Sequence, residues 1–279
     1  MIIRELNSDD VTLMRQIINT CDFDDQCVQP NLTRADVIDQ FERSFKFDDW
    51  VPLIFYDARA MPLGCVLLGV SVEGRQLSFV SGIFAINSVV SSFQDLLKWL
   101  AIQYSGYELV VSLRSHNHQL VDFLKSIQHK PAFTAKVVQW QSEQVSQGTA
   151  QKLSSCTRSE FEAISQWYDA EFSDTFWNSR RILTQFEQWE IFMLQRHQRV
   201  SEFVGGCYSE KRAIFEVFAT YSTADLRTVF EALNQQLIKQ HVTSGIWMLD
   251  ETSREYQQID QLLAPKEPWP SYFEFVWHF

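Results

Sequence analysis

The sequence contains one arrangement twice: an apolar strand followed, after a short polar break, by an amphipathic helix. The first copy spans residues 76–104 and the second spans residues 212–241. In both copies β-branched and aromatic residues precede the break, and apolar residues then recur every three or four positions. The dipeptide Phe84-Ala85 of the first copy returns as Phe218-Ala219 in the second. An internal duplication is the simplest explanation of this pattern.

The elements around these stretches keep the same order in both halves of the chain. Each half is predicted to contain a strand, two helices, three strands, a helix, a strand, a helix and a closing strand. This mixture of elements indicates an α/β (α+β) fold. The polar segment 141–151 has the composition of a linker. We therefore predict two domains, at residues 1–145 and 150–279.

The composition limits the compartment and the classes of partner. The net charge is −11 and the pI is about 5.0, so we expect no binding to nucleic acid. Five cysteines without a C-x-x-C pair fit buried thiols in a reducing compartment. The N-terminus enters a strand pattern at once, which argues against a signal peptide, and no apolar run approaches the roughly 18 residues of a membrane span. We expect a cytoplasmic protein without a membrane partner.

The element order resembles that of the GNAT N-acyltransferase superfamily, and the resemblance covers nearly the whole chain. Residues 117–124, NHQLVDFL, follow a predicted strand and are similar to the family's N-x-x-A-x-x-(L)-Y segment. The strand-to-helix stretches at Phe84 and Phe218 resemble the family's site for the pyrophosphate of acyl-CoA. The resemblance implies two tandem GNAT-like domains, each with a mixed, mostly antiparallel sheet flanked by helices. It also implies acetyl-CoA, or another acyl-CoA, as co-substrate.

The implied acyl-CoA site lies where each helix begins, since free backbone N–H groups there can bind an anion. The family's loop reads R/Q-x-x-G-x-G/A, but here Ser91 and Phe93 stand where glycines are expected in the first half, and Leu226 stands in such a position in the second. The alternative is that these positions form ordinary helix caps. The residues expected to bind the cofactor are Ser91, Ser92, Phe93, Asn117, Phe218, Ala219, Ala224, Asp225 and Leu226.

Two residues of the second half are expected to act in catalysis. Glu216 lies mid-strand, where members of the family often place a carboxylate that deprotonates the acceptor amine, and Tyr256 is a candidate general acid. Alternatively, Glu216 is solvated or paired with an arginine, and Tyr256 only packs. The counterpart of Glu216 in the first half is Gly82, which cannot act. His116 and His118 lack further ligands nearby in the sequence, so no metal site is predicted.

Two hypotheses about function follow. The first is an acyl-CoA-dependent N-acyltransferase, expected to be an acetyltransferase, that acts on a primary amine of a small molecule or peptide. The second is a catalytically inactive GNAT-like pair that serves as a ligand-binding or protein-interaction module, which the glycine-free loops favour. The acidic surface favours a cationic amine as acceptor. Both monomer and dimer remain open.

Overall fold

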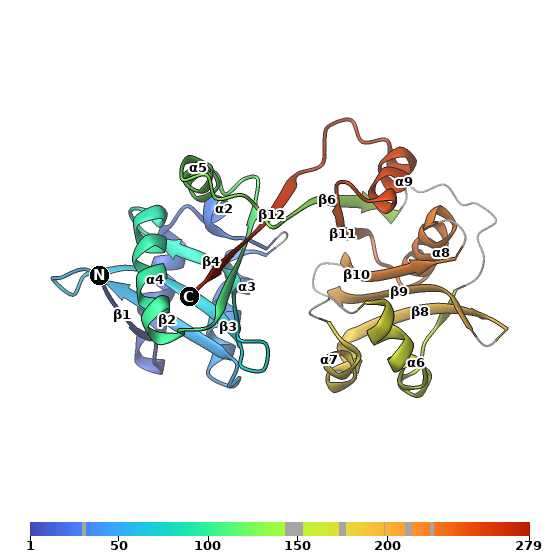
Figure 1. The fold of residues 1–279 in the computed structure, drawn as a ribbon, viewed down its shortest axis with the longest axis horizontal. Helices are drawn as coiled ribbons and strands as arrows, with labels where there is room; N and C mark the ends of the chain where they lie inside the picture. Colours follow the sequence, from blue (N-terminus) through green and yellow to red (C-terminus); the bar gives the residue numbers. More distant parts are fainter. Residues whose placement is uncertain (30–31, 143–152, 173–176, 198, 210–213, 224–225) are drawn as a thin grey trace. The chain divides into compact units, whose positions relative to one another are not determined.

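The computed structural model describes residues 1–29, 32–142, 153–172, 177–197, 199–209, 214–223 and 226–279 (Figure 1). The chain divides into two compact units. Unit 1 consists of Met1–Thr134 together with Ser271–Phe279, and unit 2 consists of Ala135–Pro270. The predicted α/β fold with mixed, mostly antiparallel sheets flanked by helices is confirmed in both.

Unit 1 contains a sheet whose strand order is β1-β2-β3-β4-β5-β12 in the described residues. Only β4 and β5 pair in parallel, and the other neighbours are antiparallel. Its strands are β1 (Ile2–Glu5), β2 (Trp50–Tyr56), β3 (Pro62–Ser71), β4 (Gln76–Ala85), β5 (Glu108–Arg114) and β12 (Ser271–His278). Its helices are η1 (Ser8–Asp10), α1 (Val11–Thr20), α2 (Phe23–Gln26), α3 (Arg34–Ser44), α4 (Val89–Gln103) and α5 (His118–Ser126).

Helices cover both faces of this sheet, and the alternation along β2 shows how. Leu53 and Phe55 belong to the core beneath α4 and α5, whereas Ile54 between them packs with α1 and α3. Successive side chains of a strand point to opposite faces, so a strand covered on both sides has a continuous run of apolar residues in its sequence.

The helix boundaries follow local chemistry. Thr33 caps α3 through a reciprocal capping box with Asp36.

Unit 2 repeats this plan, with the strand order β6-β11-β10-β9-β8-β7 in the described residues. Here β10 and β11 form the parallel pair. Its strands are β6 (Phe133–Gln141), which begins at the boundary of unit 1, β7 (Ser154–Ser155), β8 (Trp189–Arg196), β9 (Arg199–Ser209), β10 (Ile214–Ser222) and β11 (Ser244–Asp250). Its helices are α6 (Arg158–Glu171), α7 (Ser179–Thr184), η3 (Phe186–Gln188), α8 (Leu226–Lys239) and α9 (Arg254–Leu263).

The closing strands of the two halves are exchanged. Strand β12 ends the chain but pairs with β5 of unit 1, and β6, encoded in the first half, pairs with β11 of unit 2. The domain boundaries predicted from the sequence, 1–145 and 150–279, leave each closing strand in the half that encodes it, so they differ from the observed units at these strands. An alternating strand carries no local signal for which sheet it will join.

Candidate functional site

The parallel strands of each unit diverge partway along their length. In unit 1 the pairing of β4 with β5 ends at Ser78 and Val110. In unit 2 the pairing of β10 with β11 ends at Val217 and Trp247. All four strands continue beyond these points. Backbone groups on the facing edges must therefore find partners other than the neighbouring strand, which makes each gap a candidate site for an extended ligand.

A segment of unit 1 itself, residues 25–29, fills the gap between β4 and β5. Cys27 forms an antiparallel bridge with Gly82 of β4. The Val28 N–H donates to the Ser81 carbonyl at 2.9 Å. Both Cys27 and Val28 are fully buried. The segment thus runs beside β4 in the way that an added strand or an extended ligand would.

Side chains of the same segment complete its attachment to β4. The Gln26 side chain donates to the Ala85 carbonyl at 3.1 Å, and the Ala85 N–H donates to Gln26 Oε1 at 2.8 Å. The Gln29 side chain donates to the Val80 carbonyl. These backbone groups at the end of β4 are therefore already bonded within unit 1.

Asn117, predicted to bind the cofactor, holds the other side of this segment. Its Nδ2 donates to the carbonyls of Asp25, at 2.8 Å, and Cys27, at 3.1 Å. The Arg114 guanidinium also donates to the Cys27 carbonyl, from Nε at 3.2 Å. Asn117 is fully buried. In this structure its amide binds the chain's own backbone.

The remaining predicted cofactor residues of unit 1 lie in the first turn of α4. The helix begins at Val89 with Ser88 as its N-cap, so it starts earlier than a cap at Ser91 and Ser92 would place it. The Ser91 N–H bonds to the Ser88 hydroxyl, and Ser92 is buried. Phe93 is fully buried and packs edge-on against three aromatic rings, those of Phe79, Phe123 and Trp277. Phe93 is thus a core residue.

In unit 2 a bulge interrupts β10 where the strands diverge. Val217 is opposite Gly206 and Ala219 is opposite Gly205, so Phe218 is the extra residue. The Phe218 ring packs against Trp189 at 5.5 Å between centroids. Ala219 is buried in the core beneath α6 and α7. The structure therefore places Phe218 and Ala219 at the divergence, but with their side chains in packing roles.

A pocket of about 230 Å³ opens at the end of β10. Residues from α6, β10, α8 and α9 line it: Glu171, Thr220, Tyr221, Ser222, Leu226, Arg254, Glu255 and Gln258. Leu226 begins α8 and is only 6% exposed, because it also packs in the core of unit 2. The predicted cofactor residues Ala224 and Asp225 lie outside the described residues.

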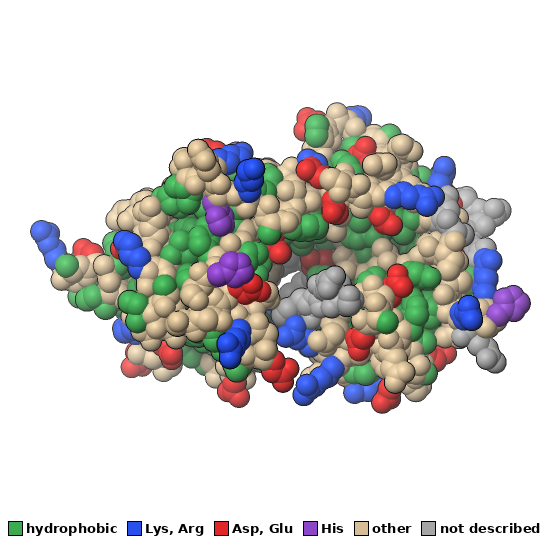
Figure 2. Space-filling view, viewed as in Figure 1, with side chains coloured by type: hydrophobic (Ala, Val, Ile, Leu, Met, Phe, Trp, Pro, Cys, Tyr) green, Lys and Arg blue, Asp and Glu red, His purple; other side chains and the backbone are tan. Residues whose placement is uncertain are grey.

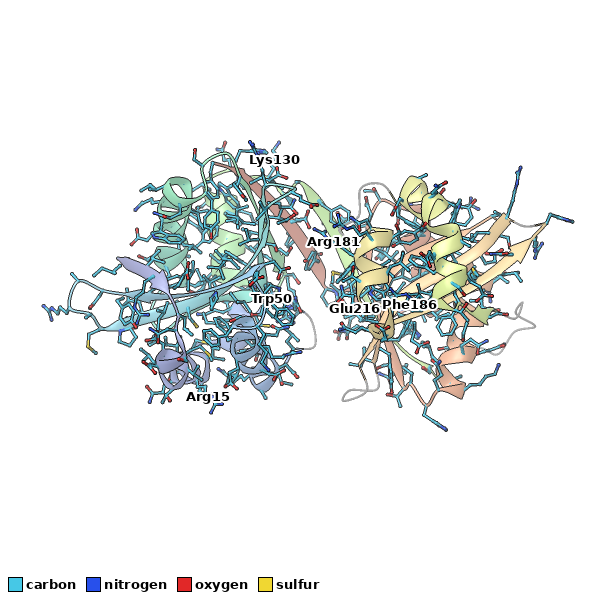
Figure 3. The ribbon with its side chains drawn as sticks, turned by 90° about the horizontal axis from the view of Figure 1, so that it is seen from below. Arg15, Trp50, Lys130, Arg181, Phe186 and Glu216 are labelled. Carbon is cyan, nitrogen blue, oxygen red and sulfur yellow. The ribbon has the colours of Figure 1, made fainter. Side chains whose placement is uncertain are left out.

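The structure does not bring the two predicted catalytic residues together. Phe215 and Val217 face the core beneath α8, so Glu216 between them faces the side of α6 and α7 (Figure 3). Glu216 is opposite Cys207 of β9. Burial raises the pKa of the Cys207 thiol to about 12, and the charge of Glu216 adds to this effect. Tyr256 packs on the α8 side. Burial there, reinforced by Asp260, raises the pKa of Tyr256, so it keeps its proton at neutral pH.

Glu202 is a candidate that the sequence predictions missed. It lies on β9 opposite Ser222, a residue that lines the pocket, and is only 4% exposed. Burial raises the pKa of its carboxyl group, although the Ser222 hydroxyl and the charge of Arg196 partly offset this effect. The sequence feature that could have identified Glu202 is a carboxylate within the largely apolar segment that begins at Val200.

Two other site classes are not represented in the part of the chain that the structure describes. No group of three or more histidine, cysteine, aspartate or glutamate residues there could hold a metal ion. None of the described helices is long and apolar enough to cross a membrane. On the face seen in Figure 2, acidic and basic side chains are interspersed and form no single basic patch.

Comparison with solved structures identifies the fold. A GCN5-related N-acetyltransferase (GNAT) from Sphaerobacter thermophilus matches with a TM-score of 0.68 and 11% identity over 99% of this chain and 95% of its own. A tandem GNAT protein from the clavulanic acid biosynthesis pathway matches with a TM-score of 0.68 and 9% identity over 99% and 98% of the two chains. A proposed acetyltransferase from Pyrococcus horikoshii matches with a TM-score of 0.62 and 13% identity over 100% and 89%.

The chain therefore has a tandem GNAT fold, as the sequence resemblance implies. No protein-family model matches the sequence. No curated protein matches it either. At identities of 9–13% the structural similarity establishes the fold alone.

Proposed function

We propose that this protein is an acyl-CoA-dependent N-acyltransferase, with acetyl-CoA as donor and a primary amine of a small molecule or peptide as acceptor. The single observation that carries the proposal is the pocket at the end of β10, where the strands of unit 2 have diverged. An extended donor could there hydrogen-bond the edge of β10 and place its thioester near the bulge at Phe218. The tandem GNAT fold supports this class of reaction by analogy.

The chemistry asks little of the protein beyond positioning and proton transfer. The ammonium first loses a proton, the amine nitrogen attacks the thioester carbonyl, and the carbon–sulfur bond breaks as the nitrogen loses a second proton and the thiolate gains one, so that CoA leaves as a thiol. Glu216, close to the bulge on the side of α6 and α7, is proposed as the base that takes the proton of the ammonium. Tyr256, which packs on the opposite, α8 side of the sheet, is proposed to supply a proton to the thiolate through the gap between β10 and β11. Its raised pKa keeps it protonated at neutral pH but makes it a weaker acid than an ordinary tyrosine.

We assign the donor site to unit 2 alone. In unit 1 the backbone edge of β4 and the amide of Asn117 are bonded to residues 25–29. A donor could enter that gap only by displacing this buried segment. The proposal therefore predicts one acyl-CoA per chain.

Isothermal titration calorimetry with acetyl-CoA tests the proposal directly. We expect saturable binding with one site per chain, and release of CoA, followed by chromatography, when primary amines are added. Two sites per chain would contradict the assignment to unit 2. No heat and no thermal shift at millimolar acetyl-CoA would overturn the acyltransferase proposal.

The second candidate function is a non-catalytic ligand-binding or protein-interaction pair. Two observations favour it: the filled gap of unit 1, and the placement of Glu216 and Tyr256 toward opposite faces of the sheet of unit 2. Under this alternative, ligands bind without turnover. Saturable acetyl-CoA binding without CoA release across a broad amine panel would support it.

A further inference from the structure

Glu202 and Ser222 form a pair beneath the pocket of unit 2. They are opposite residues of the antiparallel strands β9 and β10. Phe203 and Tyr221, which adjoin them along their strands, both pack on the side of α6 and α7. Because neighbouring side chains of a strand alternate, Glu202 and Ser222 share the other face, the side of α8.

The carboxyl group of Glu202 is only partly hydrogen-bonded by the surrounding protein. Its Oε2 atom is buried and has no hydrogen-bond partner within the described residues. The Ser222 hydroxyl hydrogen-bonds to the Glu202 side chain. An incompletely bonded carboxyl group in a protein interior opposes folding. Its presence calls for a role beyond stability.

Ser222 connects this carboxyl group to the pocket. Ser222 is part of the pocket wall, whereas Glu202 lies behind it. The wall combines charged with uncharged polar side chains. The uncharged groups Thr220, Ser222 and Gln258 suit an amide-bearing ligand, and the charged residues are Glu171, Arg254 and Glu255. The volume of about 230 Å³ is below the roughly 300–1,000 Å³ typical of a pocket that encloses a drug-sized ligand. The pocket can therefore hold at most one arm of a ligand as large as acyl-CoA.

We propose that Glu202 is a positioning residue that orients the Ser222 hydroxyl toward the pocket, where Ser222 hydrogen-bonds an amide group of the pantetheine arm of the donor. This inference rests on the proposed function. It adds a residue pair to the donor site and assigns the pocket to the arm. The nucleotide end of the donor would lie outside this pair's reach.

Variants at these two positions test the proposal with three probes: acetyl-CoA, S-acetylpantetheine and adenosine 3′,5′-bisphosphate. Ser222→Ala removes the hydroxyl group and should lower the affinity for both pantetheine-bearing probes, acetyl-CoA and S-acetylpantetheine, by about tenfold. Binding of the bisphosphate should stay within twofold. Glu202→Leu should show the same selective loss, and Glu202→Gln, which keeps a hydrogen-bonding group, should retain most of the affinity.

Stability separates positioning from a merely structural role. Glu202→Leu removes an incompletely bonded buried group, so its midpoint of thermal unfolding should equal or exceed that of the wild type. The double variant should bind no more weakly than Ser222→Ala, because both changes act on one hydrogen bond. The exposed Glu187→Gln is the matched control and should change no affinity.

The possible outcomes distinguish this inference from the proposed function. Unchanged affinity for S-acetylpantetheine in both Ser222→Ala and Glu202→Leu would overturn the inference while leaving the donor site in place. Equal weakening of all three probes, or a lower unfolding midpoint for Glu202→Leu with normal binding by Ser222→Ala, would also overturn it. If the wild type binds neither pantetheine-bearing probe, the proposed function and the inference fail together.

Discussion

The α-carbon of Gly82 faces the backbone carbonyl of Gln26 so closely that a Cβ atom at residue 82 would overlap the carbonyl oxygen. Gly82 also has a φ of +146°, which disfavours other residues. The absence of a side chain at Gly82 allows residues 25–29 to lie directly against β4. In the repeat, Gly82 is the counterpart of Glu216. The same strand position thus carries a glycine that allows the gap to be filled in unit 1 and a carboxylate in unit 2.

Replacing Gly82 with alanine should destabilise the protein by about 2–3 kcal/mol, because it combines a disfavoured φ with an overlap against backbone. Urea unfolding followed by tryptophan fluorescence measures this change. Gly106→Ala is the matched control. Gly106 also has a positive φ, +82°, but a Cβ there would meet only the Arg75 side chain, at 3.9 Å. We expect about 1 kcal/mol for the control, and equal costs for both variants would argue against the close contact.

Asn117→Ala tests whether this residue serves the fold or the ligand. The change removes the hydrogen bonds to the carbonyls of Asp25 and Cys27 and leaves them buried. We expect a loss of about 3 kcal/mol in the free energy of unfolding. Acetyl-CoA affinity, measured below the unfolding transition, should stay within twofold. The exposed Gln119→Ala, on the same helix, should change neither quantity, and a selective loss of acetyl-CoA binding in Asn117→Ala would contradict the assignment to the fold.

The repeated strand-to-helix stretches could be predicted because their signals are local. Residues 76–104 become β4 and α4, and the apolar stripes of α4 and α8 face the cores. Periodicity and capping chemistry are written within a few residues of sequence. The sequence pattern places the start of α4 at Ser91 and Ser92, which is too late, because Ser88, the actual cap, is one of several serines in the break.

The filled gap of unit 1 and the exchanged strands could not be predicted, because both depend on distant contacts. Cys27 and Gly82 lie far apart in sequence, and only a glycine within a strand hinted at a close approach. Phe93 likewise replaces an expected glycine because, in the fold, its ring fills the core beside Trp277 of the exchanged strand. A family motif cannot report such a substitution in advance.

Glu216→Gln is expected to lower the turnover of amine acylation by at least about 100-fold, since a general base commonly contributes a factor of 10² to 10⁴. The dissociation constant for acetyl-CoA should stay within twofold, because Glu216 is not part of the pocket wall. CoA release and calorimetry measure these quantities separately. Glu190→Gln is the control: Glu190 lies on β8, which is separated from β10 by β9, and it faces the side of α8, away from Glu216, because its neighbours Trp189 and Ile191 face α6 and α7. An unaltered rate in Glu216→Gln would remove this residue from the mechanism.

Glu274 on β12 should make the stability of the protein depend on pH. Burial raises the pKa of its carboxyl group above the ordinary value. The folded protein therefore retains this proton at pH values where the unfolded chain has released it. The stabilising effect of the protonated group is complete below the unfolded pKa, near 4.3, and is lost as the pH rises toward the folded pKa.

Glu274→Gln removes this titration while keeping a neutral side chain of similar shape. The variant should be more stable than the wild type at pH 7, and the difference should shrink as the pH falls toward 4. Urea unfolding at a series of pH values provides the measurement. The exposed Glu255→Gln should show a much smaller change over the same range. The opposite result would be a wild type that becomes more stable relative to Glu274→Gln as the pH rises from 4 to 7. That result would contradict the prediction and show that β12 stabilises the ionised carboxylate.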